Sequence, residues 1–125
     1  TELCEQAVQT ELGFSFAHVG LNCDTPERAG SCADQLAAMF SLAGTEGSSS
    51  IFTAERRIEL MKKIFYGQNG HLGFFTNSVE RALFQLERRG FHVMEESVRR
   101  DASGRMQSAY LQESVNGFAV HVVRR

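Results

Sequence analysis

Three histidines and one glutamate have side chains that suit the binding of a divalent metal ion. These residues are His18, Glu59, His71 and His121. Imidazole nitrogens together with a carboxylate oxygen bind Zn²⁺ or Ni²⁺, which we expect here, with Fe²⁺ or Mn²⁺ as alternatives. A lone histidine on a strand is more often a structural residue than a ligand. The prediction therefore depends on the elements that position all four side chains.

The sequence contains an internal duplication. From residue 18 it reads His-Val-Gly-Leu-Asn-Cys-Asp-Thr-Pro-Glu-Arg-Ala, and from residue 71 it reads His-Leu-Gly-Phe-Phe-Thr-Asn-Ser-Val-Glu-Arg-Ala. The two segments agree without a gap at His, Gly, Glu, Arg and Ala, which is improbable by chance. Such self-similarity indicates two copies of one structural unit. His18 and His71 then occupy the same position in each copy.

Each copy is predicted to begin with a strand and continue as a helix. Residues 14–22 and 70–76 are short apolar runs with β-branched and aromatic side chains, which indicates strands. The segments that follow carry apolar residues at a period of 3.6, which is typical of amphipathic helices. Asp24 and Asn77 can accept hydrogen bonds from first-turn amides, so we predict them as the helix N-caps.

Further strands, separated by turn residues, follow each helix. The predicted strands are, in chain order, 51–53 and 57–62 in the first copy, then 91–97, 106–112 and 118–123 in the second. The predicted turns lie in Gly44–Ser50, Asp101–Gly104 and Asn116–Gly117. The second copy therefore reads β-α-β-β-β, and the duplication predicts the same order for the first copy.

These elements predict an α+β fold class, with two βαβββ modules that form a curved mixed sheet with helices outside. Module one takes residues 14–66 and module two takes residues 67–125. Residues 1–13 carry apolar side chains at helical spacing and are predicted to form a short N-terminal helix or linker.

The last predicted strand of each copy supplies the other two candidate ligands. Glu59 and His121 each lie between two apolar residues. Successive side chains of a strand point to opposite faces, so each polar side chain faces away from its apolar neighbours. We expect the helices to cover the apolar face and a pseudo-twofold relation to bring all four candidate ligands around one metal ion.

The composition of the 125-residue chain excludes several classes of protein. Hydrophobic residues make up 42%, enough for a core and too many for wholesale disorder. The formal net charge is −2 and basic residues do not cluster in the body of the chain, which argues against nucleic-acid binding. No apolar run approaches about 18 residues, so we expect neither a membrane span nor a signal peptide.

Three cysteines, Cys4, Cys23 and Cys32, cannot all pair within the chain, and none lies in a Cys-x-x-Cys motif. Free thiols are the simpler interpretation, so we expect a reducing, cytoplasmic location. The first residue is Thr and not Met, so we expect a chain that was processed, trimmed or cut from a longer one.

The motifs resemble those of the vicinal oxygen chelate superfamily, the group of glyoxalase I, bleomycin-resistance proteins and extradiol dioxygenases. They are His-x-Gly-x-x-x-Asp, Ile-Glu-Leu and Asn-Gly-His, and the resemblance covers roughly residues 14–123. It implies a glyoxalase-like domain in which each module contributes one ligand from its first strand and one from its last. Glyoxalase I usually has a carboxylate at the position of His121, a departure that preserves coordination and weakens the case for glyoxalase activity.

A narrower resemblance is to a domain appended C-terminally to bifunctional 2-keto-3-deoxy-6-phosphogluconate/4-hydroxy-2-oxoglutarate aldolases of anaerobic Gram-positive bacteria. It depends on segments such as Phe-Ala-His-Val-Gly-Leu-Asn-Cys, Ser-Ser-Ser-Ile-Phe and Asn-Gly-Phe-Ala-Val-His. It implies that the chain is a fragment of such an aldolase, with the aldolase domain fused at its N-terminal side. The aldolase's Schiff-base lysine belongs to a barrel domain, so Lys62 and Lys63 are not assigned that role.

The resemblance implies lyase or isomerase chemistry, in which the metal acts as a Lewis acid on a small 2-oxo acid or hydroxycarbonyl compound. Glu59 is either a permanent ligand or a catalytic base that takes a proton from carbon. The alternative is a non-catalytic domain that senses a metabolite or dimerises the attached aldolase. Homodimers are common in the superfamily, so we expect a homodimer.

Four further residues are predicted to bind the substrate. Strand alternation places Arg57, Asn22 and Phe75 on the face of a candidate ligand, and Tyr110 joins them if its strand has the expected register. Arg57 suits a substrate carboxylate or phosphate, although a solvated strand-end arginine is an equal alternative. His92 has no counterpart in the duplication and is not expected to have a role in the site.

Overall fold

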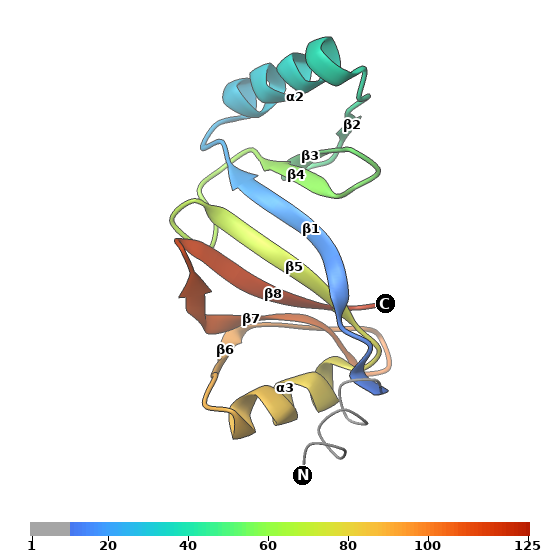
Figure 1. The fold of residues 1–125 in the computed structure, drawn as a ribbon, viewed down its shortest axis with the longest axis vertical. Coiled ribbons are helices and arrows are strands. Elements are labelled where there is room, and N and C mark those ends of the chain that lie inside the picture. Colours follow the sequence, from blue (N-terminus) through green and yellow to red (C-terminus); the bar gives the residue numbers. More distant parts are fainter. Residues whose placement is uncertain (1–10) are drawn as a thin grey trace. The chain divides into compact units, whose positions relative to one another are not determined.

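The computed structural model describes residues 11–125 (Figure 1). Most of the helix predicted for residues 1–13 lies outside these described residues. Within them, Glu11 and Leu12 are helical, and Leu12 is buried. No helix among residues 11–125 is long and apolar enough to span a membrane.

The elements follow the order β-α-β-β-β twice, as the duplication predicts (Figure 1). The first succession is β1 (Ser15–Asn22), α2 (Pro26–Phe40), β2 (Thr45–Glu46), β3 (Ser50–Thr53) and β4 (Ile58–Met61). The second is β5 (Gly70–Thr76), α3 (Val79–Arg88), β6 (Val93–Arg100), β7 (Met106–Val115) and β8 (Phe118–Arg124).

The strands form one mixed sheet with the order β2-β3-β4-β1-β5-β8-β7-β6, which confirms the α+β fold class. Strand β1 runs parallel to β4, whereas β3 pairs with β2 and β4, and β6 with β7, in antiparallel fashion. Strand β2 lies inside a stretch that was predicted to be a turn. Its two residues are extended because they pair with Ile51 and Phe52 of β3, a tertiary contact that local turn propensity does not reveal.

The helices begin one residue later than predicted. The N-caps are Thr25 and Ser78, whose hydroxyl groups accept hydrogen bonds from the amides three residues on. The prediction of Asp24 and Asn77 was wrong because both have other roles. Asp24 adopts a left-handed φ of 71°, unlike the extended backbone of an N-cap. Asn77 donates its side-chain amide to the carbonyl oxygen of Glu11.

The chain divides into two compact units, each with its own apolar core. Among the described residues, one unit comprises 11–17, 73–115 and 119–125, and the other comprises 18–72 and 116–118. We call them unit 1 and unit 2. In unit 1, α3 buries Val79, Ala82 and Leu83. In unit 2, α2 buries only Ala29, which packs with residues of β3 and β4. Strands β1 and β5 contribute residues to both units.

Candidate metal centre

Three of the four predicted ligands converge within unit 2. His18 lies on β1, Glu59 on β4 and His71 on β5. The Nε2 atom of His71 lies 3.1 Å from His18 Nε2 and 3.1 Å from Glu59 Oε1, and the last two atoms are 3.8 Å apart. The parallel register of β1 and β4, with Gly20 opposite Glu59, brings the carboxylate to the histidine face of β1.

Two glycines make room for this arrangement. A Cβ atom at Gly20 would lie 2.0 Å from Cε1 of His71, so the imidazole ring occupies the space that a side chain would take. Gly70 has a φ of +147°, and a Cβ atom there would lie 1.8 Å from the carbonyl oxygen of Gly20. Both the His-x-Gly and the Asn-Gly-His motifs therefore have a steric cause, since only glycine permits this approach.

Ser50 is a site residue that sequence reasoning missed. Its hydroxyl group donates a 2.8 Å hydrogen bond to Oε2 of Glu59, and Ser50 is buried. Ser50 begins β3, in which Phe52 lies opposite Glu59. Residues 50 and 52 of a strand share one face. The register of β3 on β4 places Ser50 on the face of Glu59, and this register cannot be read from the sequence.

Burial and neighbouring charges set the protonation of the site. Burial lowers the pKa of His18, and His71 and Arg56 lower it further against the opposing effect of Glu59. Burial alone would raise the pKa of Glu59, but hydrogen bonds from His71 and Ser50 and the nearby histidines hold that pKa below its usual value. At neutral pH the site thus offers a neutral His18 imidazole and an ionised Glu59 carboxylate. Metal ligation requires these protonation states.

The spacing of the three donor atoms fits a bound divalent ion. Two ligands at about 2.1 Å from a metal are separated by about 3.0 Å in octahedral and about 3.4 Å in tetrahedral geometry. The observed separations of 3.1, 3.1 and 3.8 Å lie near these values. The side chains are also withdrawn from solvent, with exposed fractions of 1% for His71, 14% for His18 and 15% for Glu59.

His121, the fourth predicted ligand, belongs to unit 1. It lies on β8 and is half-buried. Its ring stacks on that of Tyr110, with the centroids 4.1 Å apart and the planes 2° from parallel. Tyr110 is buried on β7. The stacking fixes the plane of the His121 imidazole. Its participation in the metal site stays a prediction.

The other predicted substrate-binding residues have varied surroundings. Asn22 ends β1 and donates a 2.9 Å hydrogen bond to the carbonyl oxygen of Gly67. The buried Oδ1 atom of Asn22 has no hydrogen-bond partner among the described residues. Arg57 is exposed and immediately precedes β4, so the strand predicted for residues 57–62 begins one residue later than predicted.

Phe75 of β5 is half-buried in unit 1, with the guanidinium group of Arg125 5.6 Å from its ring centroid. His92 precedes β6, and its side chain is 57% exposed. Its Nδ1 atom lies 2.8 Å from a carboxylate oxygen of Glu113. His92 therefore has an ion-pair partner of its own in a solvated position.

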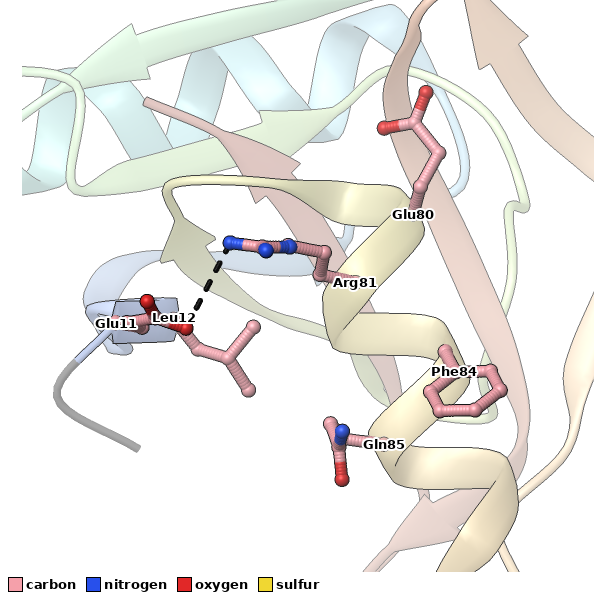
Figure 2. A pocket seen from close by; sticks show the side chains of 6 residues that line it. All are labelled: Glu11, Leu12, Glu80, Arg81, Phe84 and Gln85. Atoms are coloured by element: carbon pink, nitrogen blue, oxygen red, sulfur yellow. Dashed lines mark ion pairs between the residues drawn. The ribbon is translucent and has the colours of Figure 1, made fainter. Parts of the chain in front are cut away.

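Unit 1 also contains a pocket, which is shown in Figure 2. Its volume is about 360 Å³, and it is lined by Glu11, Leu12, Glu80, Arg81, Phe84 and Gln85. Arg81 points toward Glu11, and the two form an ion pair of 3.7 Å (Figure 2). None of the predicted site residues lines this pocket. It is an open surface feature beside α3 and not the candidate metal centre.

Comparisons with known proteins identify the fold. No protein-family model matches the chain, and no curated protein matches its sequence. A Streptomyces coelicolor methylmalonyl-CoA epimerase variant, solved in complex with 2-nitronate-propionyl-CoA, is 13% identical, with a TM-score of 0.59. That match covers 87% of this chain and 95% of the epimerase.

Two other solved structures agree. The Mycobacterium tuberculosis methylmalonyl-CoA epimerase is 12% identical with a TM-score of 0.61, over 87% of this chain and 86% of that one. A hypothetical protein from Bacillus halodurans is 13% identical with a TM-score of 0.62. That match covers 90% of this chain and 94% of the other. At such identity the likeness concerns the fold alone. The chain therefore has the glyoxalase-like fold that these epimerases share.

Proposed function

We propose that the chain binds one divalent metal ion and catalyses an isomerase or lyase reaction on a small carbonyl compound with two neighbouring oxygen atoms. The observation that carries the proposal is the convergence of His18, Glu59 and His71, whose donor atoms lie within 3.8 Å of one another. Two imidazoles and a carboxylate on separate strands form a built site, in which Gly20 leaves space for the ring of His71 and Gly70 leaves space for the backbone of Gly20.

We include His121 as the fourth ligand. The duplication supports this role, because the last strands of the two β-α-β-β-β successions carry Glu59 and His121 between apolar neighbours. The strand order also supports it, since β8 is the neighbour of β5, which carries His71. Three imidazoles and one carboxylate suit Zn²⁺ or Ni²⁺, with Fe²⁺ or Mn²⁺ as alternatives.

A bound divalent ion would supply a Lewis acid toward two neighbouring oxygen atoms of the substrate. The residues of the chain determine what else happens there. The hydroxyl group of Ser50 donates a hydrogen bond to Oε2 of Glu59, so Oε1 is the oxygen that faces the two histidines. The lowered pKa of Glu59 makes its carboxylate a weaker proton acceptor and keeps it ionised at neutral pH. We therefore assign Glu59 first as a ligand, and as the catalytic base only if it leaves the metal.

The proposed substrate is a 2-oxo acid, a hydroxycarbonyl compound or a related acyl derivative. The titles of the similar epimerase structures name methylmalonyl-CoA and a propionyl-CoA nitronate as bound molecules. Asn22 could accept a hydrogen bond from the substrate at its Oδ1 atom. Arg57, which is exposed, would bind a carboxylate or phosphate, and Phe75 and Tyr110 would contact apolar parts.

The proposal extends to assembly. The resemblance to a superfamily in which homodimers are common supports a homodimer, and the aldolase-like motifs support a natural attachment to a 2-keto-3-deoxy-6-phosphogluconate/4-hydroxy-2-oxoglutarate aldolase. Light scattering on the purified chain tests the first point. A homodimer gives twice the chain mass of 13.9 kDa, and a monomer contradicts it.

Metal analysis is the decisive experiment for function. The protein is stripped with a chelator, supplied in turn with zinc, nickel, iron and manganese, dialysed and analysed by mass spectrometry for bound metal. We expect about one ion per chain for at least one metal, and its loss in His71→Ala. His92→Ala is the matched control, because His92 is solvated and paired with Glu113, and it should retain the ion.

Two results would oppose the proposal in different ways. If both His71→Ala and His121→Ala retain full stoichiometry, the ligand set is wrong. If the wild-type chain binds metal but turns over no 2-oxo acid, hydroxycarbonyl compound or acyl thioester, the non-catalytic sensing or dimerisation role replaces the enzyme role.

A further inference from the structure

Two thiols lie side by side in unit 2, apart from the candidate metal ligands. Cys23 is the first residue after β1, and Cys32 lies on α2. Their Sγ atoms are 3.9 Å apart, and both side chains pack into the apolar cluster of Ala29, Ile51 and Leu60. A disulfide bond needs an S–S distance of about 2.05 Å, so the two sulfur atoms must approach by roughly 2 Å. Side-chain rotation on a lightly packed helix can supply such a movement.

The two thiols differ in access to solvent. Cys23 is 4% exposed, and burial together with the hydrogen bond to Cys32 raises the pKa of its thiol to about 11. Cys32 is half-buried on α2. A thiol must be accessible to react with a dissolved oxidant. Cys32 is therefore the residue that an oxidant reaches first, and Cys23 is the neighbour that can react with the product.

We propose that Cys32 and Cys23 are a reversible oxidation site that hydroperoxides convert to an intramolecular disulfide bond. First, the Cys32 thiolate attacks one oxygen of hydrogen peroxide, so an S–O bond forms and the O–O bond breaks. The departing hydroxide takes up a proton and leaves as water. Peroxide is reduced, and Cys32 becomes a sulfenic acid.

In the second step the sulfur of Cys23 attacks Sγ of Cys32. The S–S bond forms, the S–O bond breaks, and the departing hydroxide leaves as water with the proton from the Cys23 thiol. In sum, two thiols and one hydrogen peroxide give one disulfide and two waters. A small thiol reductant reverses the reaction by thiol–disulfide exchange.

The bond would join α2 to the end of β1, the strand that carries His18. This connection matters because α2 is only partly packed. Ala29 is its one fully buried residue, Ala33 and Leu36 are partly buried, and both Met39 and Phe40 are exposed. Oxidation is therefore expected to stabilise α2 and the β1–α2 turn. The oxidised chain should have a melting temperature higher by roughly 5 °C, because the cross-link restricts the unfolded chain.

The experiment uses the full chain with Cys4→Ser, which removes the third thiol, and equimolar hydrogen peroxide at neutral pH. Trypsin cleaves after Arg28, which lies between the two cysteines and therefore separates them. Arg28 is the first Lys or Arg of the chain, so the peptide that contains Cys23 begins at residue 1. The disulfide then joins peptide 1–28 to peptide 29–56. We expect this linked mass in the monomer, its loss on dithiothreitol treatment, and the rise in melting temperature.

Two variants test the order of attack. In Cys23→Ser, the Cys32 sulfenic acid should persist and be trapped by dimedone. In Cys32→Ser, oxidation of Cys23 should be at least tenfold slower than thiol loss in the parent. The proposal is overturned if the parent keeps both thiols free at peroxide concentrations that oxidise exposed protein thiols, or if the linkage forms only between chains. Faster oxidation of Cys23 than of Cys32 would overturn the assigned order.

Discussion

The imidazole ring of His71 occupies the space in which a side chain at residue 20 would lie. A Cβ atom on Gly20 would stand 2.0 Å from Cε1 and 2.5 Å from Nε2 of that ring, and Nε2 is the atom that faces both His18 and Glu59. The glycine of the His-x-Gly motif thus acts on the site through sterics, with no chemistry of its own.

Gly20→Ala is therefore expected to displace His71. Metal affinity should fall at least tenfold, and overpacking of the buried ring should cost roughly 1–3 kcal/mol of unfolding free energy. Titration calorimetry and urea unfolding measure the two effects. The control is Gly30→Ala, since Gly30 lies on α2 with nothing within 4 Å of its Cβ position. That variant should gain about 0.5–1 kcal/mol and bind metal normally. Unchanged metal affinity in Gly20→Ala would contradict the steric interpretation.

Ser50→Ala should weaken metal binding without removing any ligand. The hydroxyl group holds Oε2 of Glu59 at 2.8 Å, and residues that orient a ligand typically change metal affinity by about 10–100-fold. The measurement is the affinity for Zn²⁺ in competition with a chromophoric chelator. Ser31→Ala, at an exposed position of α2, is the control and should have no effect. Equal affinities in the two variants would show that Ser50 does not position Glu59.

Glu59→Gln separates the two roles of that carboxylate. A neutral amide is a poor metal ligand, so the ligand role predicts at least a tenfold loss of metal affinity together with the loss of activity. The base role predicts lost activity with normal metal affinity. We expect the first outcome because of the lowered pKa of Glu59. Calorimetric titration of the metal-free protein with metal distinguishes the two roles. The matched control is Glu46→Gln, at an exposed position of β2.

Asp101 should contribute to stability in a defined range of pH. Hydrogen bonds from Ser103 and Arg105 and the nearby Arg124 lower the pKa of its carboxyl group from 3.8 to about 2. A group whose pKa is lower in the folded state stabilises that state above its unfolded pKa. The contribution is lost as the pH falls through the folded value. The difference in urea midpoint between wild type and Asp101→Asn should therefore be constant above pH 4 and shrink toward pH 2. A constant difference down to pH 2 would contradict the hydrogen-bond network.

The convergence of three candidate ligands was predictable because it depends on periodicity and duplication. The repeat places His18 and His71 at equal strand positions, and the alternation in β4 directs Glu59 away from its apolar neighbours. Periodicity and duplication do not predict the role of Ser50. Its hydrogen bond to Glu59 depends on the register of β3 on β4, which no local pattern encodes. The same patterns do not predict the helix starts, where Asp24 adopts a left-handed conformation and Thr25 is the N-cap.

The extent of β4 shows the same limit. The sequence predicts a strand over residues 57–62, but the structure pairs only Ile58–Met61, and Arg57 ends an exposed turn. Residues 54–56 of that turn all have positive φ values, a conformation that their side chains rarely adopt. Residue propensity therefore predicts that the strand exists but does not predict where it begins. The geometry of the preceding turn determines its first residue.

The space between Gly20 and His71 also constrains how such a site can arise by single substitutions. A chain with a larger residue at position 20 would meet the ring of His71 with a clash, because the Cβ position lies within 2.5 Å of three ring atoms. A stepwise route in which the glycine precedes the histidine avoids this clash and costs less stability than the opposite order. Once the histidine is in place, a larger residue at position 20 displaces the ring, so the pair is lost at lower cost when the histidine is replaced first.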